Sequence, residues 1–395
     1  MASRASPIET QRRIAIVTSI HPDFDARIWK HACSMASAGW QVDLIAPWVH
    51  RDEQIPDGVT LHPFARVTSR LRRPVLIPLR IARRLLPLLR SCDIVHFHDI
   101  DILPWMSLLS LVQPTVYDVH EDYPEEMLIR EWVPGVLRKP FALMLEVGQR
   151  LFARPIRNVV LTQPELEAEF PGAWFRREFI YNYATVRLAE GRADDYLTRQ
   201  PTVVFIGSQH TNNGSDLLIE IAARVAKERP QVKFLASDRF ANAGLRSEAI
   251  ERMKRLGATS MEFIPNVRPH ELMSVLNRAT IAISPNLRVK QQIRGAHNKT
   301  YEFMAAGLPI VLSDLPRQVE AVGKSECGIL AQPEDVESFV RAVIRLVDDP
   351  GEGQRLGQNG VRAFREKYSW ESQMPRLLAL YDHMLGGRPQ RGTRR

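Results

Sequence analysis

Two series of short apolar segments, each interrupted by helical patterns, constrain the fold of this chain most strongly. The first series has an apolar segment at residues 12–18, a helical pattern over 27–39 and a second apolar segment at 41–46. Short apolar runs that alternate with helices are typical of buried parallel strands joined by crossover helices. Further strands of this series are predicted at residues 93–97, 114–119, 159–161 and 179–181.

The second series follows a polar, irregular stretch at residues 182–200. Its strands are predicted at residues 202–206, 232–235, 261–264, 280–284 and 310–312. The sequence therefore predicts an α/β protein with two doubly wound, Rossmann-like parallel sheets. The expected divisions are an N-terminal domain over residues 1–184, a linker over 185–200, a second domain over 201–368, and a closing helix with a basic tail over 369–395. Ligands bind beyond the carboxyl ends of such strands, so the crevice between the domains is the expected site.

Length and composition exclude several classes of protein. The 395 residues are enough for two domains of this kind. No apolar run approaches the roughly 18 to 20 residues that a membrane-spanning helix needs. Arg12 and Arg13 precede only a short apolar stretch, unlike a signal peptide, so we expect a cytoplasmic protein. The widely separated Cys33, Cys92 and Cys327 favour buried thiols over disulfides or a zinc cluster.

Positive charge is concentrated between Leu61 and Arg90, where no acidic residue occurs. The eight arginines of this segment are Arg66, Arg70, Arg72, Arg73, Arg80, Arg83, Arg84 and Arg90. Interleaved leucines make the segment better suited to an anionic membrane surface than to a nucleic-acid groove. We expect peripheral attachment to the inner face of a membrane and no nucleic-acid partner; the alternative is a solvated helix face with a buried apolar side. Pro74, Pro78 and Pro87 predict that no single helix runs through the segment.

A polar loop, a short helical pattern and a buried strand follow one another over residues 295–311. Asn298 is a suitable N-cap, and Gly307 with Pro309 ends the helix before the apolar strand. The N–H groups at the start of such a helix suit a diphosphate, and Glu302, one turn in, is placed to accept two ribose hydroxyls. The pattern therefore predicts a nucleotide site, although an ordinary helix-to-strand connection has the same features.

The same residues resemble the C-terminal signature of GT-B glycosyltransferases of family four, a Lys-x-x-Glu-x-Met-Ala-x-Gly-x-Pro pattern that begins here at Lys299. The resemblance covers almost the whole chain. It implies the GT-B fold, with a last helix that crosses back onto the first domain. It also implies transfer of a sugar from a nucleoside-diphosphate donor to a hydroxyl acceptor, with retained configuration and no bound metal. Lys299 and Glu302 are then donor-binding and catalytic residues.

Two N-terminal motifs support this resemblance. No glycine occurs from Ile14 to Ala38, where an NAD-dependent enzyme would carry its glycine-rich turn. The segment at residues 21–27 instead resembles the family's His-Pro-x-x-Asp-x-Arg opening, which implies that His21, Asp25 and Arg27 face the acceptor; as ordinary surface charges they would carry no function. The Asp-x-His-Glu segment implies that His120 orients the donor sugar and donates to developing charge. Glu121 is assigned to the acceptor side.

The sequence His96-Phe97-His98-Asp99-Ile100-Asp101 combines metal-ligand residue types with a strand-end position. Residues two apart share a face of a strand, but no third ligand can be identified from the sequence. The segment also resembles the Val-His-x-His-Asp strand end of GT-B enzymes. We therefore predict no metal and no cofactor.

The chain departs from the family at the diphosphate. Gly207 is followed by Ser208 where an arginine is common, and Asn213 precedes Gly214 where a lysine is common. The segment resembles a Gly-Ser-x-His-x-x-Asn variant of some members, which implies that Gly207, Ser208 and Asn213, with Arg294, are still donor-binding residues. Lys299 is our first choice for the missing cation, and Arg294 is the second. Arg294 also replaces the first acid of the family's Glu-x7-Glu motif.

The leading hypothesis is a glycosyltransferase of envelope or exopolysaccharide assembly, with a nucleotide-sugar donor and a glycan or lipid-linked acceptor. One alternative is a catalytically inactive sugar-nucleotide-binding subunit, which the missing cations favour. Another is a sugar-nucleotide epimerase of the same architecture, which would require acid and base carboxylates at the crevice.

Overall fold

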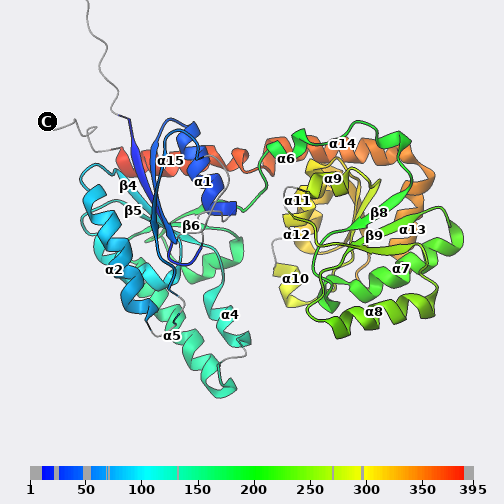
Figure 1. Cartoon of the computed structure of the whole chain (residues 1–395), viewed down its shortest axis with the longest axis horizontal. Helices are drawn as coiled ribbons and strands as arrows, with labels where there is room; N and C mark the ends of the chain where they lie inside the picture. The colour runs from blue at the N-terminus through cyan, green and yellow to red at the C-terminus, as the bar shows by residue number, and fades with distance from the viewer. Residues whose placement is uncertain are drawn as a thin grey trace, which may run out of the picture. The chain divides into compact units, whose positions relative to one another are not determined.

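The computed structural model describes residues 11–21, 26–47, 55–67, 69, 72–130, 133–268, 271–294 and 298–386. The chain divides into two compact units, each with its own parallel sheet (Figure 1). The N-terminal unit comprises Met1–Asn182 and Gln373–Arg395, and the C-terminal unit comprises Tyr183–Ser372. The predicted linker at residues 185–200 thus belongs to the second unit, where it forms α6 (Arg187–Glu190) and a 3-10 turn.

The sheet of the N-terminal unit has seven strands in the order β3-β2-β1-β4-β5-β6-β7. The strands are β1 (Arg13–Val17), β2 (Gln41–Pro47), β3 (Val59–Phe64), β4 (Ile94–Phe97), β5 (Thr115–Val119), β6 (Asn158–Leu161) and β7 (Arg176–Phe179). The helices are α1 (Ala26–Ser37), α2 (Arg73–Leu85), α3 (Leu103–Leu109), α4 (Tyr123–Ile129), α5 (Gly135–Ala153) and α15 (Met374–Leu385). Alternate strand residues face opposite layers, so Ala15 and Val17 join the core under α2, α3 and α5. His31 of α1 and Tyr381 of α15 lie against β4 on the other face.

The C-terminal unit has six parallel strands in the order β10-β9-β8-β11-β12-β13. The strands are β8 (Thr202–Phe205), β9 (Lys233–Ser237), β10 (Met261–Ile264), β11 (Ile281–Ser284), β12 (Ile310–Ser313) and β13 (Gly328–Ala331). The other helices are α7 (Ser215–Glu228), α8 (Ala243–Leu256), α9 (Leu272–Leu276), α10 (Lys290–Arg294), α11 (Asn298–Ala305), α12 (Pro316–Gln318), α13 (Val336–Asp348) and α14 (Pro350–Lys367). One core lies between the sheet and α7 with α13, and a second lies between the sheet and α9 with α11.

Two strands were not predicted, and both lie at sheet edges. β3 contains Pro63, which lacks a backbone donor and is tolerated only where no second neighbour needs it. β13 begins at Gly328, where a side chain would overlap the carbonyl oxygen of Ile310 on the neighbouring strand. The last predicted strand of the first series lies three residues earlier than expected, as β7.

As predicted, no single helix runs through the arginine-rich segment, which contains the end of β3, α2 and a separate 3-10 turn. Pro78, however, does not interrupt α2. Pro74 lies in the first turn, where no backbone donor is needed, but Pro78 lies inside the helix. The buried side chains Ile77, Ile81 and Leu85 anchor this helix on both sides of Pro78, and that packing offsets the lost hydrogen bond. A separate 3-10 turn with Pro87 follows.

Cys33, Cys92 and Cys327 form no disulfide bond. Burial raises the pKa of the Cys92 and Cys327 thiols to about 12, whereas Cys33 is only half-buried. In the part of the chain that the structure describes, no helix is both long enough and apolar enough to cross a bilayer.

Candidate active site

The central strands of the N-terminal sheet end level with one another. Val17 of β1 pairs with Phe97 of β4, and Phe97 pairs with Tyr117 of β5. Because the strands are parallel, the residues that follow them meet at one edge of the sheet. The edge therefore carries His21, His98, Asp99, His120 and Glu121, all of which were named from the sequence as acceptor-side, catalytic or strand-end residues.

Asp99 organises the loop after β1. Its backbone has a φ of 74°, an uncommon conformation for a residue other than glycine. Its carboxylate accepts from Thr18 Oγ1 and from the Ser19 backbone N–H, both at 2.7 Å, and His21 Nε2 lies 3.1 Å away. Burial opposes ionisation, but the contacts with His21, Ser19 and Thr18 lower the pKa of Asp99 to about 2. The carboxylate is therefore charged at neutral pH and fixes the position of His21.

His120 contacts a second buried carboxylate through a neighbouring ring. His98 Nδ1 is 2.8 Å from His120 Nε2 and 3.3 Å from Asp118 Oδ2. His120 Nε2 is 3.8 Å from the same oxygen. Burial lowers the pKa of His98 to about 3, although Asp118 opposes this change, so His98 is neutral. Since Nε2 is engaged, Nδ1 is the ring nitrogen that His120 can offer to a ligand.

Arg27 supports this cluster from within. Its guanidinium donates to both carboxylate oxygens of Asp118, at 2.9 and 3.0 Å, and to the carbonyl of Ile180 at 3.0 Å. Burial opposes ionisation of Asp118, but Arg27 keeps the pKa of this carboxyl well below its usual range. Arg27 is 3% exposed. The sequence placed Arg27 toward the acceptor; the geometry instead gives it a positioning role under His120.

Tyr381 of α15 completes the network. Its hydroxyl is 2.8 Å from His31 Nε2 and 2.8 Å from His96 Nδ1, and His96 Nε2 is 3.3 Å from Asp118. A residue near the end of the chain is thus joined through His96 and Asp118 to the histidines at the strand ends. The last helix packs onto the first unit, as the family resemblance implies.

We predict that Tyr381→Phe lowers the free energy of unfolding by about 1–3 kcal/mol, because two buried ring nitrogens lose their partner. Denaturant unfolding checks this value. Tyr117→Phe is the matched control, since the buried Tyr117 hydroxyl has no hydrogen-bond partner in the described structure. The control should be neutral or stabilising. Equal losses in both variants would contradict the network.

The histidines form two groups with metal-binding geometry. His31, His96 and His98 make one group, and His98, Asp118 and His120 make the other, with ligand atoms within 4.8 Å of one another. His31 is the third ligand that the sequence did not identify. The relevant atoms of His31 and His96 already bond to Tyr381 and Asp118, and Arg27 already pairs with Asp118. These atoms are therefore already engaged within the cluster, whereas the buried His98 Nε2 has no hydrogen-bond partner among the described residues. The absence of a metal stays a prediction.

The candidate donor residues lie at the carboxyl edge of the C-terminal sheet. Gly207 follows β8 with a φ of 149°, and a methyl group on it would overlap Lys299 Nζ. Lys299, near the start of α11, is thus in contact with the backbone after β8, and its Nζ lies 5.4 Å from the centre of the Phe205 ring. Glu302 follows on the same face of α11. The structure therefore brings Gly207, Lys299 and Glu302 together, as the sequence predicted.

Burial and two neighbouring charges determine the protonation state of Lys299. Burial lowers its pKa to about 8, Glu302 opposes this change, and Arg239 adds to it. Arg239 follows β9, and its backbone carbonyl accepts from the Gln209 N–H at 2.8 Å. Arg239 could not be identified from the sequence as a candidate site residue, because it belongs to no recognisable motif. Arg239 therefore adds a second cation near Lys299 at this edge of the sheet.

The remaining predicted donor residues shape the loop after β8. The Asn213 amide donates to the Ser208 carbonyl at 2.8 Å, and Asn213 Oδ1 accepts from Gln292 Nε2 at 2.8 Å. Asn213 thus stabilises the loop after β8 by hydrogen bonds, at the position where a lysine is common in the family. Arg294 ends α10, but its side chain lies outside the described part of the chain, as does Asp25.

Comparisons with known proteins agree with this architecture. Residues 26–182 match the model described as Glycosyltransferase Family 4, and residues 200–349 match the one described as Glycosyl transferases group 1. The chain belongs to the GT-B glycosyltransferases. It is 37% identical over 113 residues to the MMP alpha-(1->4)-mannosyltransferase of Mycolicibacterium hassiacum. The matched residues cover 28% of this chain and 26% of that protein. The chain thus spans about a quarter of that relative's length.

Two solved structures have the same fold over nearly the whole chain. Sucrose-phosphate synthase of Thermosynechococcus elongatus has a TM-score of 0.69 at 16% identity and covers 95% of this chain and 100% of that one. Anabaena HepE in complex with UDP and glucose has a TM-score of 0.63 at 14% identity, covering 93% and 98%. At this level of sequence identity, the structural similarity shows only that the chain has the GT-B fold. The fold predicted from the sequence is therefore confirmed.

Proposed function

We propose that this GT-B protein transfers a sugar from a nucleoside-diphosphate donor to a hydroxyl acceptor. The observation that carries the proposal is the contact between Lys299 and the Gly207 backbone at the carboxyl edge of the second sheet, with Glu302 on the same helix face. Anabaena HepE, which shares the fold, is named as a complex with UDP and glucose. A nucleoside diphosphate needs a cation for its phosphates and an acceptor for its ribose, and these residues supply both.

In the proposed reaction, Lys299 and Arg239 neutralise the diphosphate while Glu302 accepts the two ribose hydroxyls. His120 orients the sugar and donates to charge that develops as the bond to the diphosphate breaks. The acceptor oxygen bonds to the anomeric carbon on the face that the diphosphate leaves, so configuration is retained. The departing phosphate oxygen takes the acceptor proton, and no side-chain base is needed. Lys299, Glu302 and His120 are the catalytic residues of this scheme.

The chain's arginine-rich segment supports a membrane-bound acceptor. Arg80 donates to the Ala65 carbonyl just after β3 and Arg84 donates to the Pro63 carbonyl within β3, whereas Arg72, Arg83 and Arg90 are exposed. We include in the proposal a lipid-linked glycan acceptor at an anionic membrane, in envelope or exopolysaccharide assembly. The exposed arginines, not Arg80 and Arg84, are then the residues that reach the lipid.

The direct test is to incubate the protein with UDP-, GDP- and ADP-sugars and to measure released nucleoside diphosphate, with and without EDTA. We expect release from at least one donor, unaffected by EDTA, because side-chain cations hold the diphosphate. Donor binding without release, with lipid-linked and soluble acceptors alike, would favour the inactive binding subunit. Release of a free epimeric sugar nucleotide would favour the epimerase, and no donor binding at all would contradict the proposal.

Donor affinity should fall as pH rises through the pKa of Lys299. This pKa is lowered to about 8, so the side chain is a cation below that pH and neutral above it. If only the cation binds diphosphate, affinity falls by about tenfold per pH unit above the pKa. Calorimetric titration of the preferred nucleoside diphosphate on both sides of that pKa checks the slope. A wild-type profile as flat as that of Lys299→Met would contradict the role of Lys299.

A further inference from the structure

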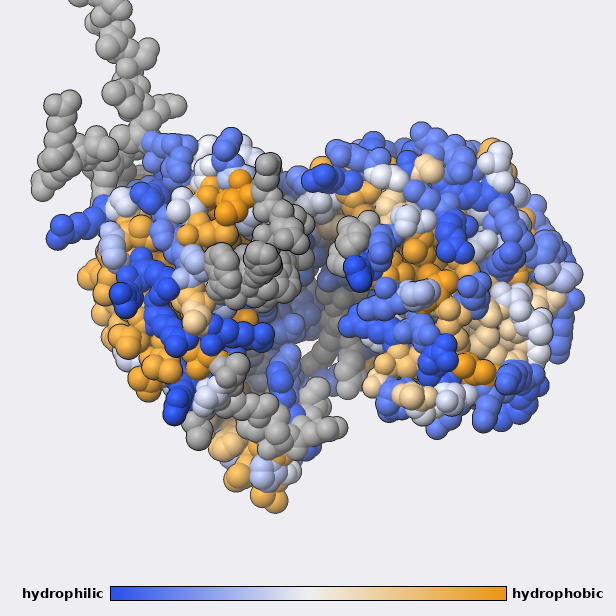
Figure 2. Space-filling model, viewed as in Figure 1, coloured by the Kyte–Doolittle hydropathy of each residue, from blue (hydrophilic) through white to orange (hydrophobic). Residues whose placement is uncertain are grey.

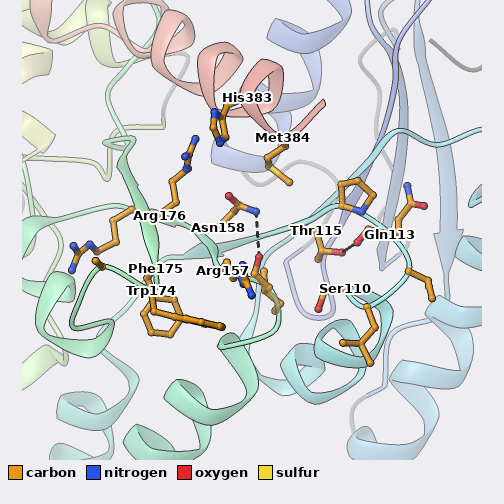
Figure 3. A pocket seen from close by; sticks show the side chains of 16 residues that line it. Ser110, Gln113, Thr115, Arg157, Asn158, Trp174, Phe175, Arg176, His383 and Met384 are labelled. Carbon is orange, nitrogen blue, oxygen red and sulfur yellow. Dashed lines mark hydrogen bonds between the residues drawn. The ribbon is translucent and has the colours of Figure 1, made fainter. Parts of the chain in front are cut away.

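A cavity of about 780 Å³ opens at the amino edge of the N-terminal sheet, opposite to the edge that carries His120 (Figure 3). Its lining comes from the residues that precede or begin β5, β6 and β7, from the end of α3, and from the end of α15. Figure 3 shows Arg157 beside Trp174 on one wall and His383 with Met384 of α15 on another. Nothing in the proposed transfer reaction uses this cavity.

The lining is cationic. It includes Arg157, Arg176 and Arg177 and no carboxylate. Arg177 lies 3.6 Å from Glu167 and donates to the Phe170 carbonyl. Arg157, at a φ of 64°, stacks 4.2 Å over the Trp174 ring. Neither Arg157 nor Arg176 forms an ion pair with any residue that the structure describes, so the cavity suits an anion.

The rim is apolar. Leu111 and Val112 line the cavity and are 71% and 73% exposed, and Trp174 is 53% exposed. Leu111 and Val112 continue an exposed stripe on α3, and α5 packs beside α3 with a stripe of its own. We call this surface the α3–α5 apolar face; its residues are Trp105, Leu108, Leu111, Val112, Leu143, Met144, Val147 and Leu151.

The spacing of the α3–α5 apolar face shows that it is not part of the core. On each helix its residues recur every three or four positions, whereas the inward side chains of α3 are Leu103 and Met106. The members of this face are all apolar, and α5 also carries the half-buried Glu146–Arg150 ion pair. Figure 2 shows apolar residues at the surface on the side of this unit that carries α2. Apolar surface of this extent in a soluble domain marks an interaction site.

α2 adds cations beside the apolar face. It covers the same side of the sheet as α3 and α5, and its exposed side chains include Val75, Leu79, Arg72 and Arg83. Apolar side chains flanked by uncompensated arginines are complementary to an anionic bilayer, where acyl chains and phosphates occur together. A soluble phosphate would use the cavity cations but not Leu111 or Val112.

We propose that this side of the N-terminal unit docks on an anionic phospholipid bilayer, and that the cavity receives the phosphate headgroup of one lipid. Arg157 and Arg176 bind the phosphate, and the acyl chains lie along Leu111, Val112 and the α3–α5 apolar face. This docking rests on the proposed function for its purpose, because it would hold the protein at the membrane that carries the lipid-linked acceptor. Lipid binding is nevertheless measurable without sugar transfer.

Flotation with phosphatidylcholine vesicles, with and without phosphatidylglycerol, tests the docking at low salt. Wild type should bind only the anionic vesicles. Arg157→Gln with Arg176→Gln should lose tenfold or more in affinity, since each surface cation contributes about fivefold. Leu111→Ser with Val112→Ser should lose a similar factor. Lys254→Gln with Arg255→Gln, at the exposed end of α8, is the control of equal charge change and should bind as wild type.

Calorimetry with submicellar dihexanoylphosphatidylglycerol and with glycerol 3-phosphate distinguishes the ligand. The lipid analogue should bind at least tenfold more tightly than glycerol 3-phosphate, and Arg176→Gln alone should weaken it. Equal affinities would show a soluble-phosphate site and overturn the proposal. Wild type that ignores anionic vesicles, or cavity variants that bind them unchanged, would also overturn it. Retained nucleotide release in those samples would leave the proposed transfer intact.

Discussion

Replacing His120 with alanine should reduce turnover about 10²–10³-fold and leave donor affinity nearly unchanged. The reason is that its proposed hydrogen bond strengthens as the sugar separates from the diphosphate, so the loss falls on the transition state. The side chain is 11% exposed, and its Nε2 is held by His98 and Asp118. A steady-state comparison of kcat and KM with the preferred donor measures the effect.

His383→Ala is the control for this comparison, because His383 is an exposed histidine of the same unit, away from the carboxyl edge of the sheet. It should keep wild-type turnover with a soluble acceptor. If His120→Ala instead changed the dissociation constant of the donor more than kcat, the assignment would be wrong. His120 would then be a ground-state binding residue.

Glu302→Ala should weaken binding of the nucleoside diphosphate by about 2–3 kcal/mol. An ionised acceptor of two ribose hydroxyls is lost, and Lys299 loses the carboxylate that stabilises its charged form. Calorimetric titration measures the change directly.

The matched control is Glu320→Ala, which removes an exposed glutamate of the same unit in the π-helical turn after α12, where it pairs with Lys324 at 3.1 Å. Its donor affinity should equal that of wild type. An unchanged affinity in Glu302→Ala would rule out the ribose role. A 2′-deoxy nucleotide should lose less affinity in Glu302→Ala than the ribonucleotide does.

The fold was predictable where a local pattern carries it. The apolar runs before Thr18, His98 and His120 are long enough to mark buried strands, and they place these residues at one sheet edge. Edge strands carry weaker patterns, so β3 with Pro63 and β13 with Gly328 went unpredicted. Pro78 lies inside α2 although proline disfavours a helix interior, because the burial of its neighbours outweighs the helix-propensity penalty of proline.

Most residues of the candidate site were predictable from the sequence, whereas the contacts between them were not. Lys299 and Gly207 are separated by a large part of the chain, and only the family motif suggested that they belong together. Tyr381, His31 and His96 meet through three distant elements, and no spacing in the sequence records that contact. Arg27 illustrates the same limit, since a charged residue near a helix start gives no sign that it is buried against Asp118.

Calorimetric titration of UDP, GDP and ADP into wild type and Lys299→Met tests directly whether this protein binds the diphosphate of a nucleotide through Lys299. Methionine keeps the length and apolar stem of lysine and removes only the charge. We expect at least one nucleoside diphosphate to bind wild type. Its affinity should fall tenfold or more in Lys299→Met, because a hydrogen bond to a charged group contributes about 1.5–3 kcal/mol. Equal affinity of the two proteins for every nucleoside diphosphate would contradict this expectation.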